Sequence, residues 1–162
     1  MIRILFICHG NICRSPMGEF ILKDMARRDG FEDRVYVASA ATTDDETAFG
    51  GSHIYPPARR TLLSHGISQS GIDDKRARKL LRSDADKYDL FICMDSENVW
   101  DARSILGKTA ESKIKRCLDF AEGERHGRDV SDPWYTRDFE AAYSDICAGC
   151  EGIAEYVKKE SK

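Results

Sequence analysis

The sequence predicts one α/β domain, built on a parallel sheet with helices on both faces. Apolar segments of strand length alternate along the chain with segments whose apolar residues recur at helical spacing, a pattern typical of a parallel sheet with right-handed crossovers. The length of 162 residues suits a single domain, and neither a repeat nor a low-complexity linker divides it. Ligands of such folds bind beyond the carboxyl ends of the strands.

The first strand and the first helix are the clearest elements. An apolar run over residues 4–7 predicts the strand, and Pro16 suits the first turn of a helix. Gly30 is a plausible end of that helix. Apolar residues recur at helical spacing between these two points, at Met17, Phe20, Ile21 and Met25.

The middle of the chain repeats the pattern. Residues 34–39 predict a second strand, and residues 42–53, which are polar and rich in glycine, predict a loop. Two prolines open a helix over residues 56–65, and Gly66 ends it. Residues 75–82 predict a shorter helix.

The last part of the chain completes the sheet. Residues 88–94 are nearly all apolar and predict a third strand, and residues 113–118 predict a short fourth one. Between them, residues 96–106 predict a helix that ends at Gly107. A long amphipathic helix closes the chain, with apolar residues spaced by three and four at Phe139, Tyr143, Ile146, Cys150, Ile153 and Val157.

The composition of the chain argues against a nucleic-acid partner and against a membrane partner. The net charge of −3, with 41% apolar and 33% charged residues, gives no support for a nucleic-acid partner. No apolar run approaches a membrane span, and Met1 opens a strand rather than a signal peptide. We therefore expect a cytoplasmic protein without a membrane partner, and six cysteines that remain free thiols.

Residues 8–15 carry the strongest chemical signal. Cys8 stands where a strand ends and Arg14 where a helix begins. The helix N-terminus, the guanidinium and the Ser15 hydroxyl all favour a thiolate, which is the nucleophilic form of cysteine. The same donors suit a tetrahedral oxyanion, and the Arg14 fork can bind two of its oxygens.

Other residues of this segment shape the loop. Gly10 permits a close backbone approach, and Asn11 tolerates the left-handed region and can fix the loop with its side chain. The segment lacks the Gly-x-x-x-x-Gly-Lys pattern of nucleotide-binding loops. A plainer alternative makes Cys8 a buried structural thiol and Arg14 a surface cation, but that leaves the strand, loop and helix context unexplained.

The second chemical element lies in residues 119–135, a segment too long to be structureless in a small domain unless it is functional. Cleavage of a phosphate ester needs an acid for the leaving oxygen, and Asp132 is the candidate. Pro133 stiffens its position, while Trp134 and Tyr135 offer an aromatic wall for a phenyl ring. As a bare dipeptide, Asp-Pro is more often only a turn.

The stretch ILFICHGNICRSPMGE, residues 4–19, resembles the signature of low-molecular-weight protein tyrosine phosphatases. The resemblance implies one phosphatase domain over residues 1–162, with strand order 2-1-3-4. It also implies hydrolysis of phosphotyrosine in proteins through a phosphocysteine, without metal or cofactor, by a monomer or weak dimer that phosphate inhibits as product. Further matches are Ala38-Ser39-Ala40, the segment from Pro57-Ala58-Arg59 through His65-Gly66-Ile67, Ala77-Arg78, the segment from Tyr88-Asp89 through Cys93-Met94-Asp95, and Asp132-Pro133-Trp134-Tyr135.

The resemblance also suggests supporting roles. Ser39 and Asn11 match positions that brace the phosphate loop, and His65 either joins that network or caps its own helix. Many relatives carry a further histidine just before Ala77, and this chain does not, which indicates an altered network. Cys13 matches a cysteine that can form a protective disulfide with the nucleophile.

Two features near the loop bear on specificity. His9 stands where many relatives have an apolar residue, and we expect it to face the entrance or to be solvated without a role. Residues 44–46 form an acidic cluster that is either an ordinary solvated loop or part of the cleft mouth. In the second case, it favours basic peptides.

Several rival functions share parts of this pattern. Arginine phosphatases of the same family are the main alternative on substrate. They typically carry threonine at the position of Ile12, whereas Ile12 keeps the apolar contact expected of tyrosine phosphatases. Arsenate reductases need two further cysteines on a mobile segment, and residues 66–90 contain none. A phosphocysteine carrier would relay phosphate rather than hydrolyse the ester. It needs no acid such as Asp132, so the segment Asp132-Pro133-Trp134-Tyr135 argues against this function. A metal module built from Cys8, Cys13, Cys147 and Cys150 has poor spacing, and Arg14 repels a cation.

Overall fold

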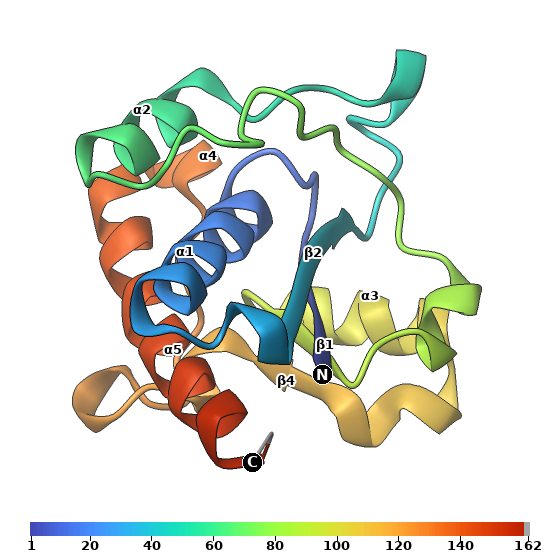
Figure 1. The fold of residues 1–162 in the computed structure, drawn as a ribbon. Helices are drawn as coiled ribbons and strands as arrows, with labels where there is room; N and C mark the ends of the chain where they lie inside the picture. Colours follow the sequence, from blue (N-terminus) through green and yellow to red (C-terminus); the bar gives the residue numbers. More distant parts are fainter. Residues whose placement is uncertain (161–162) are drawn as a thin grey trace.

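The four strands form one parallel sheet with the order β2-β1-β3-β4, as the sequence and its family resemblance predict. The computed structural model describes residues 1–160, and Figure 1 shows their arrangement. In chain order, the strands and α-helices are β1 (Ile2–Cys8), α1 (Arg14–Asp29), β2 (Val35–Ala41), α2 (Pro56–Ser64), β3 (Leu90–Cys93), α3 (Ser96–Leu106), β4 (Ile114–Arg116), α4 (Pro133–Thr136) and α5 (Phe139–Glu160).

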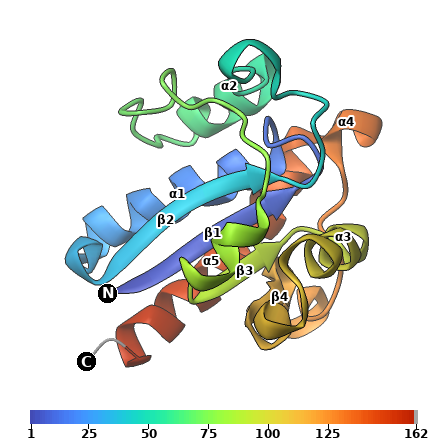
Figure 2. The same cartoon turned by 90° about the vertical axis from the view of Figure 1, so that its right-hand side faces the viewer.

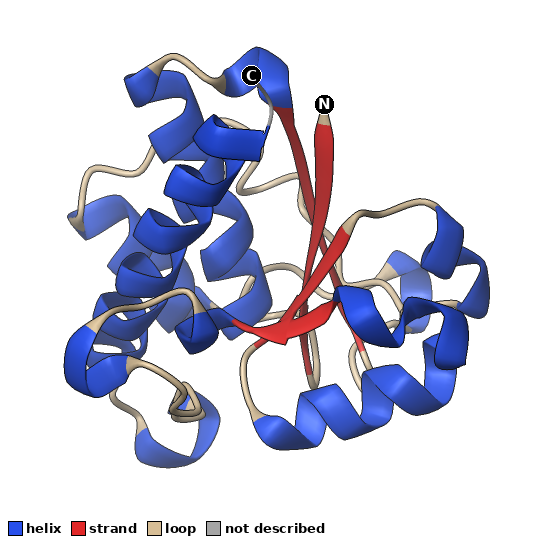
Figure 3. Cartoon of the chain, turned by 90° about the horizontal axis from the view of Figure 1, so that it is seen from below, coloured by secondary structure: helices blue, strands red, loops and turns tan. Residues whose placement is uncertain are grey.

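Helices cover both faces of this sheet, as Figure 3 shows. Because side chains alternate along a strand, β1 sends Ile4 and Phe6 to one face and Leu5 and Ile7 to the other. The first face packs against α1 and α5, and the second packs against α3. All four side chains are fully buried, so the strand that ends at Cys8 is held from both sides.

The carboxyl ends of the strands converge on one edge of the sheet. The loop after β1 and the short helix α4 lie there, while the start of β1 and the end of α5 lie toward the opposite end (Figure 2). α1 begins at Arg14 and is capped at its C-terminal end by Gly30, which adopts the left-handed conformation with φ of 75°. α3 is capped by Asp95, whose carboxylate accepts a hydrogen bond from the backbone N–H of Asn98. Both α1, which follows β1, and α3, which follows β3, therefore begin at the carboxyl edge of the sheet.

Gly18 lies where α1 crosses the sheet. A Cβ atom at this position would lie 2.7 Å from Cδ1 of Phe6 and 3.1 Å from Cε of Met94. Both neighbours are fully buried in the packed core. The missing side chain therefore lets α1 approach β1 closely.

The helix predicted over residues 75–82 does not form. Instead, the backbone there is extended and pairs with the end of β2. The Ala41 amide donates to the Arg78 carbonyl at 2.7 Å, and the Leu80 amide donates to the Ala41 carbonyl at 2.7 Å. This long-range pairing outweighs the local helical preference. The segment ends in a short 3-10 helix, Arg82–Asp86.

Other boundaries differ by a few residues. β3 begins at Leu90 rather than at residue 88, and β4 ends at Arg116 rather than at residue 118. Residues 119–135 contain a 3-10 turn, Gly123–Arg125, and the start of α4, so this functional segment is folded rather than structureless.

Candidate active site

The loop between β1 and α1 directs hydrogen-bond donors at the sulfur of Cys8. The backbone N–H groups of Asn11 and Ser15 donate to Cys8 Sγ at 3.3 and 3.4 Å. The hydroxyl of Ser15 lies 3.0 Å from the same sulfur. Asn11 adopts φ of 59°, in the left-handed region that its short polar side chain tolerates. This geometry suits a thiolate, and beyond it the oxygens of a phosphoryl group.

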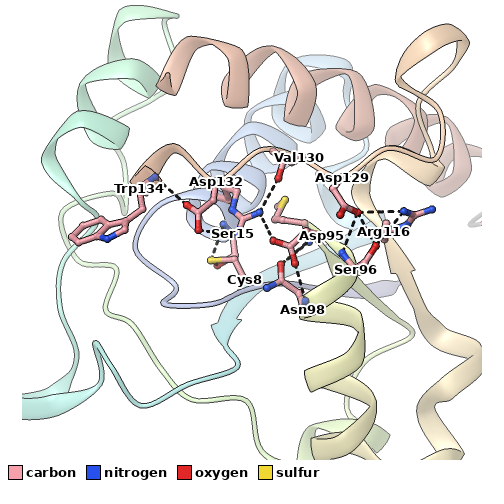
Figure 4. Close-up of polar contacts among 12 residues, drawn as sticks. Cys8, Ser15, Asp95, Ser96, Asn98, Arg116, Asp129, Val130, Asp132 and Trp134 are labelled. Carbon is pink, nitrogen blue, oxygen red and sulfur yellow. Dashed lines mark hydrogen bonds and ion pairs between the residues drawn. The ribbon is translucent and has the colours of Figure 1, made fainter. Parts of the chain in front are cut away.

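Arg14 lies at the start of α1 and is almost completely buried. Its Nη1 donates to Asp95 Oδ2 at 2.7 Å and to the Val130 carbonyl at 2.8 Å. Burial disfavours the charge, but Cys8 and Asp95 outweigh this effect and raise the pKa of Arg14 above its ordinary value. Figure 4 shows Cys8, Asp95 and Asp132 gathered around this point. A fixed cation therefore stands beside the thiol.

Asp132 reaches the same cleft from the other side. Its Oδ2 lies 3.4 Å from Arg14 Nη2, and its Oδ1 accepts a hydrogen bond from the Trp134 amide at 3.0 Å. Asp132 thus caps α4, and Pro133 occupies the first helical position. The side chain is about a quarter exposed, so it can exchange protons with solvent. Cys8, Arg14 and Asp132 line one cleft of about 270 Å³.

Aromatic side chains line the outer part of the cleft. Trp134 packs on Tyr55 with ring centroids 5.1 Å apart, and Arg137 lies over the Trp134 ring at 5.4 Å. Tyr135 lines the cleft and is largely exposed. Tyr55, which orients Trp134 from the start of α2, was not predicted from the sequence. Ile12 adds an apolar surface to the same cleft.

The mouth of the cleft is acidic. His9 is half-exposed and its Nε2 lies 2.7 Å from Asp45 Oδ2, which joins the phosphate loop to the acidic cluster. Asp45, Glu46 and Glu97 line the mouth together with His9 and Gly10. The acidic cluster therefore borders the cleft, as one of the two sequence-based interpretations expects.

A buried network supports the loop from behind. The side-chain amide of Asn11 donates to Ser15 Oγ at 2.8 Å and to Ser39 Oγ at 2.9 Å. Ser39 in turn donates to Glu19 Oε1 at 2.6 Å. Glu19 is buried on α1 and was not predicted as a site residue, although an acid four positions after Ser15 shares its helix face.

The comparisons with known proteins agree with this geometry. Residues 3–162 match the family model for low molecular weight phosphotyrosine protein phosphatases. The chain belongs to this family. It is 40% identical over 166 residues to the low molecular weight protein-tyrosine-phosphatase YfkJ of Bacillus subtilis. The aligned region covers 100% of this chain and 99% of YfkJ. The family, the fold and the protein-tyrosine-phosphatase activity that the sequence predicts are thereby confirmed.

Solved structures extend the comparison. The crystal structure of YfkJ matches this phosphatase with a TM-score of 0.90 at 38% identity, over 100% of this chain and 98% of that one. SP-PTP of Streptococcus pyogenes matches with a TM-score of 0.79 at 31% identity, over 100% and 95% of the chains. The YwlE arginine phosphatase matches with a TM-score of 0.82 at 24% identity, over 98% of this chain and 97% of that one. At this low identity, the likeness to YwlE concerns the fold alone.

His65 does not join the network behind the phosphate loop. Its Nε2 lies 2.6 Å from Glu140 Oε2, and its ring stacks on Tyr143 with centroids 3.9 Å apart. The residue follows the last turn of α2 and is partly exposed, so it contacts α5 rather than the loop. In this phosphatase, His65 serves the packing of α2 against α5.

The remaining cysteines lie in different surroundings. Cys13 lines the cleft, and burial raises the pKa of its thiol well above the ordinary value, with the charges of Cys8 and Asp132 adding to the rise. Cys147 and Cys150 lie on α5, away from the cleft, and Cys150 is fully buried. Within residues 1–160, no group of three or more His, Cys, Asp or Glu side chains could hold a metal ion.

The described part of the phosphatase contains no helix with the length and apolar content that crossing a bilayer requires.

Proposed function

We propose that this phosphatase hydrolyses phosphotyrosine in proteins by two transfers through Cys8. The observation that carries the proposal is the position of three groups in one cleft. The thiol of Cys8 receives converging N–H donors, the Arg14 guanidinium lies beside it, and the Asp132 carboxyl faces both. Nucleophile, charge stabilisation and acid are thus supplied by one chain.

In the first transfer, the Cys8 thiolate attacks phosphorus while the bond from phosphorus to the tyrosyl oxygen breaks. Arg14 and the loop amides stabilise the charge on the equatorial oxygens. Asp132 gives its proton to the departing phenolate, so phenol leaves and phosphocysteine remains. Contacts with Asp95 and the Val130 carbonyl fix the guanidinium plane, which reduces the reorganisation that the reaction requires.

In the second transfer, water attacks phosphocysteine and the sulfur leaves as thiolate. The ionised Asp132 accepts the proton from that water, which returns the acid to its starting form. The Ser15 hydroxyl, 3.0 Å from the sulfur, stabilises the thiolate as it departs. Inorganic phosphate is the product and binds the same loop as a competitive inhibitor. Neither transfer calls on a metal ion or a cofactor.

Substrate choice rests on the outer cleft. Trp134, supported by Tyr55, and Tyr135 form a wall along which a phenyl ring can pack. Ile12 contributes an apolar contact and offers no hydroxyl to a guanidinium. The arginine-phosphatase alternative needs polar recognition of the phosphoarginine guanidinium, so this lining favours phosphotyrosine.

The test compares matched peptides that differ only in carrying phosphotyrosine or phosphoarginine, in the presence of a chelator. Phosphate release from the phosphotyrosine peptide by wild type, and none by Cys8→Ser, is the expected result. Release mainly from phosphoarginine would assign the protein to the alternative. Residual turnover by Cys8→Ser above background would overturn Cys8 as the nucleophile.

The proposal includes redox protection of the nucleophile. Peroxide would convert Cys8 to a sulfenic acid, and the Cys13 thiol would then displace water to form a disulfide. Both residues line the same cleft. Mass spectrometry would detect the loss of two hydrogen atoms in wild type, reversible by a dithiol. Cys13→Ser should instead proceed to irreversible oxidation.

We also propose a cytoplasmic location and a monomer or weak dimer as the acting species. A nucleophilic thiol is preserved in a reducing compartment, and all six cysteines are free in the structure. One chain holds the whole cleft, so activity should not depend on protein concentration. Fractionation and sedimentation velocity measure these two properties.

A further inference from the structure

Trp134 lines the catalytic cleft, and two residues outside the lining of the cleft contact its indole ring. The ring of Tyr55 lies 5.1 Å from that ring between centroids, at an interplanar angle of 56°. The guanidinium carbon of Arg137 lies 5.4 Å from the indole centroid. The cleft is lined by Trp134 but by neither Tyr55 nor Arg137. Any effect of these two residues on a bound phenyl ring is therefore exerted through Trp134.

A hydrogen bond joins the two supporting side chains to each other. Nη1 of Arg137 donates to the Tyr55 hydroxyl oxygen at 3.1 Å. Arg137, Tyr55 and Trp134 thus form a closed triangle of one hydrogen bond and two ring contacts. Trp134 is 43% exposed, so burial in the core does not fix its rotamer. The orientation of the indole depends on this triangle.

Tyr55 is the fixed corner of the triangle, because its backbone is bound to the phosphate loop. Its N–H donates to the Ile12 carbonyl at 2.8 Å, and the residue directly precedes α2. Its ring also packs near Phe139, at a centroid distance of 6.0 Å, and against the main hydrophobic core. Whatever holds Trp134 against Tyr55 therefore sets where the aromatic wall stands relative to the loop that carries Cys8.

Arg137 reaches this corner from an unusual backbone position. It ends α4 in the left-handed conformation, with φ of 61° and ψ of 11°, and its N–H donates to the Pro133 carbonyl at 2.9 Å. Glycine is the residue usually found at such a helix end, because a side chain there carries a conformational cost. Arg137 is exposed, and its guanidinium contacts are those to Tyr55 and Trp134. These contacts are what the side chain contributes at this position.

We propose that Arg137 is a positioning residue that determines specificity for aryl phosphates, by clamping Trp134 against Tyr55 in the orientation that receives the phenyl ring. The inference rests on the proposed hydrolysis of phosphotyrosine and deepens it. A wall that is ordered before the substrate arrives need not be ordered on binding, which raises affinity. The clamp acts on the ring of the substrate, whereas the loop of residues 8–15 binds the phosphoryl oxygens independently of it.

The test uses Arg137→Gly, which removes the clamp and suits the left-handed backbone, so its unfolding midpoint should not fall. Two phosphonates that no phosphatase step can cleave are titrated by calorimetry. Benzylphosphonate carries a phenyl ring one atom from phosphorus, and methylphosphonate carries none. The Kd of benzylphosphonate should rise about fivefold, the size expected when one side chain must be ordered on binding. The Kd of methylphosphonate should stay as in wild type.

Two further variants separate the parts of the clamp from general charge. Tyr55→Phe keeps the ring contact and removes only the hydrogen bond, so it should weaken benzylphosphonate less than Arg137→Gly does. Arg60→Gln is the matched control, because it removes the same charge from an exposed position on α2. Its ratio of the two Kd values should equal that of wild type. Equal weakening of both phosphonates in Arg137→Gly, an unchanged Kd for benzylphosphonate, or the same change in Arg60→Gln would each overturn the proposal.

The motion of Trp134 gives a second readout. The chain has two tryptophans, and Trp100 lies on α3, largely exposed and outside the lining of the cleft. In a Trp100→Phe background, the fluorescence anisotropy of Trp134 should decay faster on the nanosecond scale once Arg137→Gly is added. An unchanged decay would contradict the clamp. Neither measurement needs turnover, so the clamp can fail while the proposed hydrolysis holds, and the reverse.

Discussion

Arg14 Nη2 lies 3.4 Å from Asp132 Oδ2 across the cleft. The guanidinium edge that faces Asp132 is also the edge that a phosphoryl group needs. Substrate and carboxylate therefore compete for one cation. The competition matters because a phosphoryl group that takes this edge of Arg14 releases Asp132 from its ion pair.

Asp132→Asn should therefore separate catalysis from binding. For phenyl phosphate, whose leaving group needs a proton, kcat should fall about 10² to 10³-fold, within the range for general acid catalysis. For aryl phosphates with good leaving groups, the loss should be much smaller. Binding of inorganic phosphate should tighten, because a repelling carboxylate is gone. A series of substituted aryl phosphates and a phosphate titration measure these effects.

Asp129→Asn is a suitable control for that series, because Asp129 is exposed and pairs with Ser96 and Arg116 outside the cleft. Its kinetics should match the wild type. Equal losses of Asp132→Asn on all leaving groups would argue against an acid role.

The two cysteines of the loop should differ sharply in reactivity. Burial raises the pKa of Cys13 above its ordinary value, so its thiol stays protonated at neutral and mildly alkaline pH. Iodoacetamide at pH 7 should therefore label Cys8 first and leave Cys13 largely unmodified until the protein unfolds. Peptide mapping after timed quenching measures this, and inorganic phosphate should slow the labelling of Cys8. Labelling of Cys13 at the same rate would contradict the prediction.

The parts of the fold that were predicted well are those set by local signals. Residues 96–106 form a helix as predicted, because a capping Asp95 and a terminal Gly107 mark its ends. The loop of residues 8–15 was found for the same reason, since the strand, loop and helix that define it are contiguous in the sequence.

What sequence reasoning missed depends on contacts between distant residues. The predicted helix over residues 75–82 is extended because it pairs with Ala41. Glu19 was missed because its partner Ser39 lies 20 positions away. Sequence reasoning left His65 between the loop network and a cap of its own helix. It caps α2, and its side chain lies beside Glu140, a partner 75 positions away that the neighbouring residues do not reveal.

Gly18→Ala should lower stability, although alanine favours helices over glycine by about 1 kcal/mol. The new methyl group would lie 2.7 Å from the ring of Phe6, and inserting a group into a packed core costs about 1–3 kcal/mol. We therefore expect a lower midpoint of chemical unfolding. Adding Phe6→Leu should recover part of the loss, as a double-mutant cycle would show. A gain in stability for Gly18→Ala alone would mean that α1 can shift freely.

The acidic mouth should select basic peptides. Asp45, Glu46 and Glu97 line it, and Arg14, which lines the same cleft, is buried and already paired. Phosphotyrosine flanked by lysines should be preferred over the same peptide flanked by glutamates by about tenfold in kcat/KM at low salt, because complementary charge speeds encounter. Raising the ionic strength should reduce the preference, since exposed charges are screened.

Neutralising the mouth separates this electrostatic effect from the chemistry. The combined substitutions Asp45→Asn, Glu46→Gln and Glu97→Gln should bring the ratio between the two peptides toward one. Glu151→Gln, an exposed charge on α5, is the matched control and should leave the ratio as in wild type. If the ratio in wild type is already near one at low salt, peptide selection must come from the aromatic wall, and variants of Trp134 rather than of the acidic residues should then alter it.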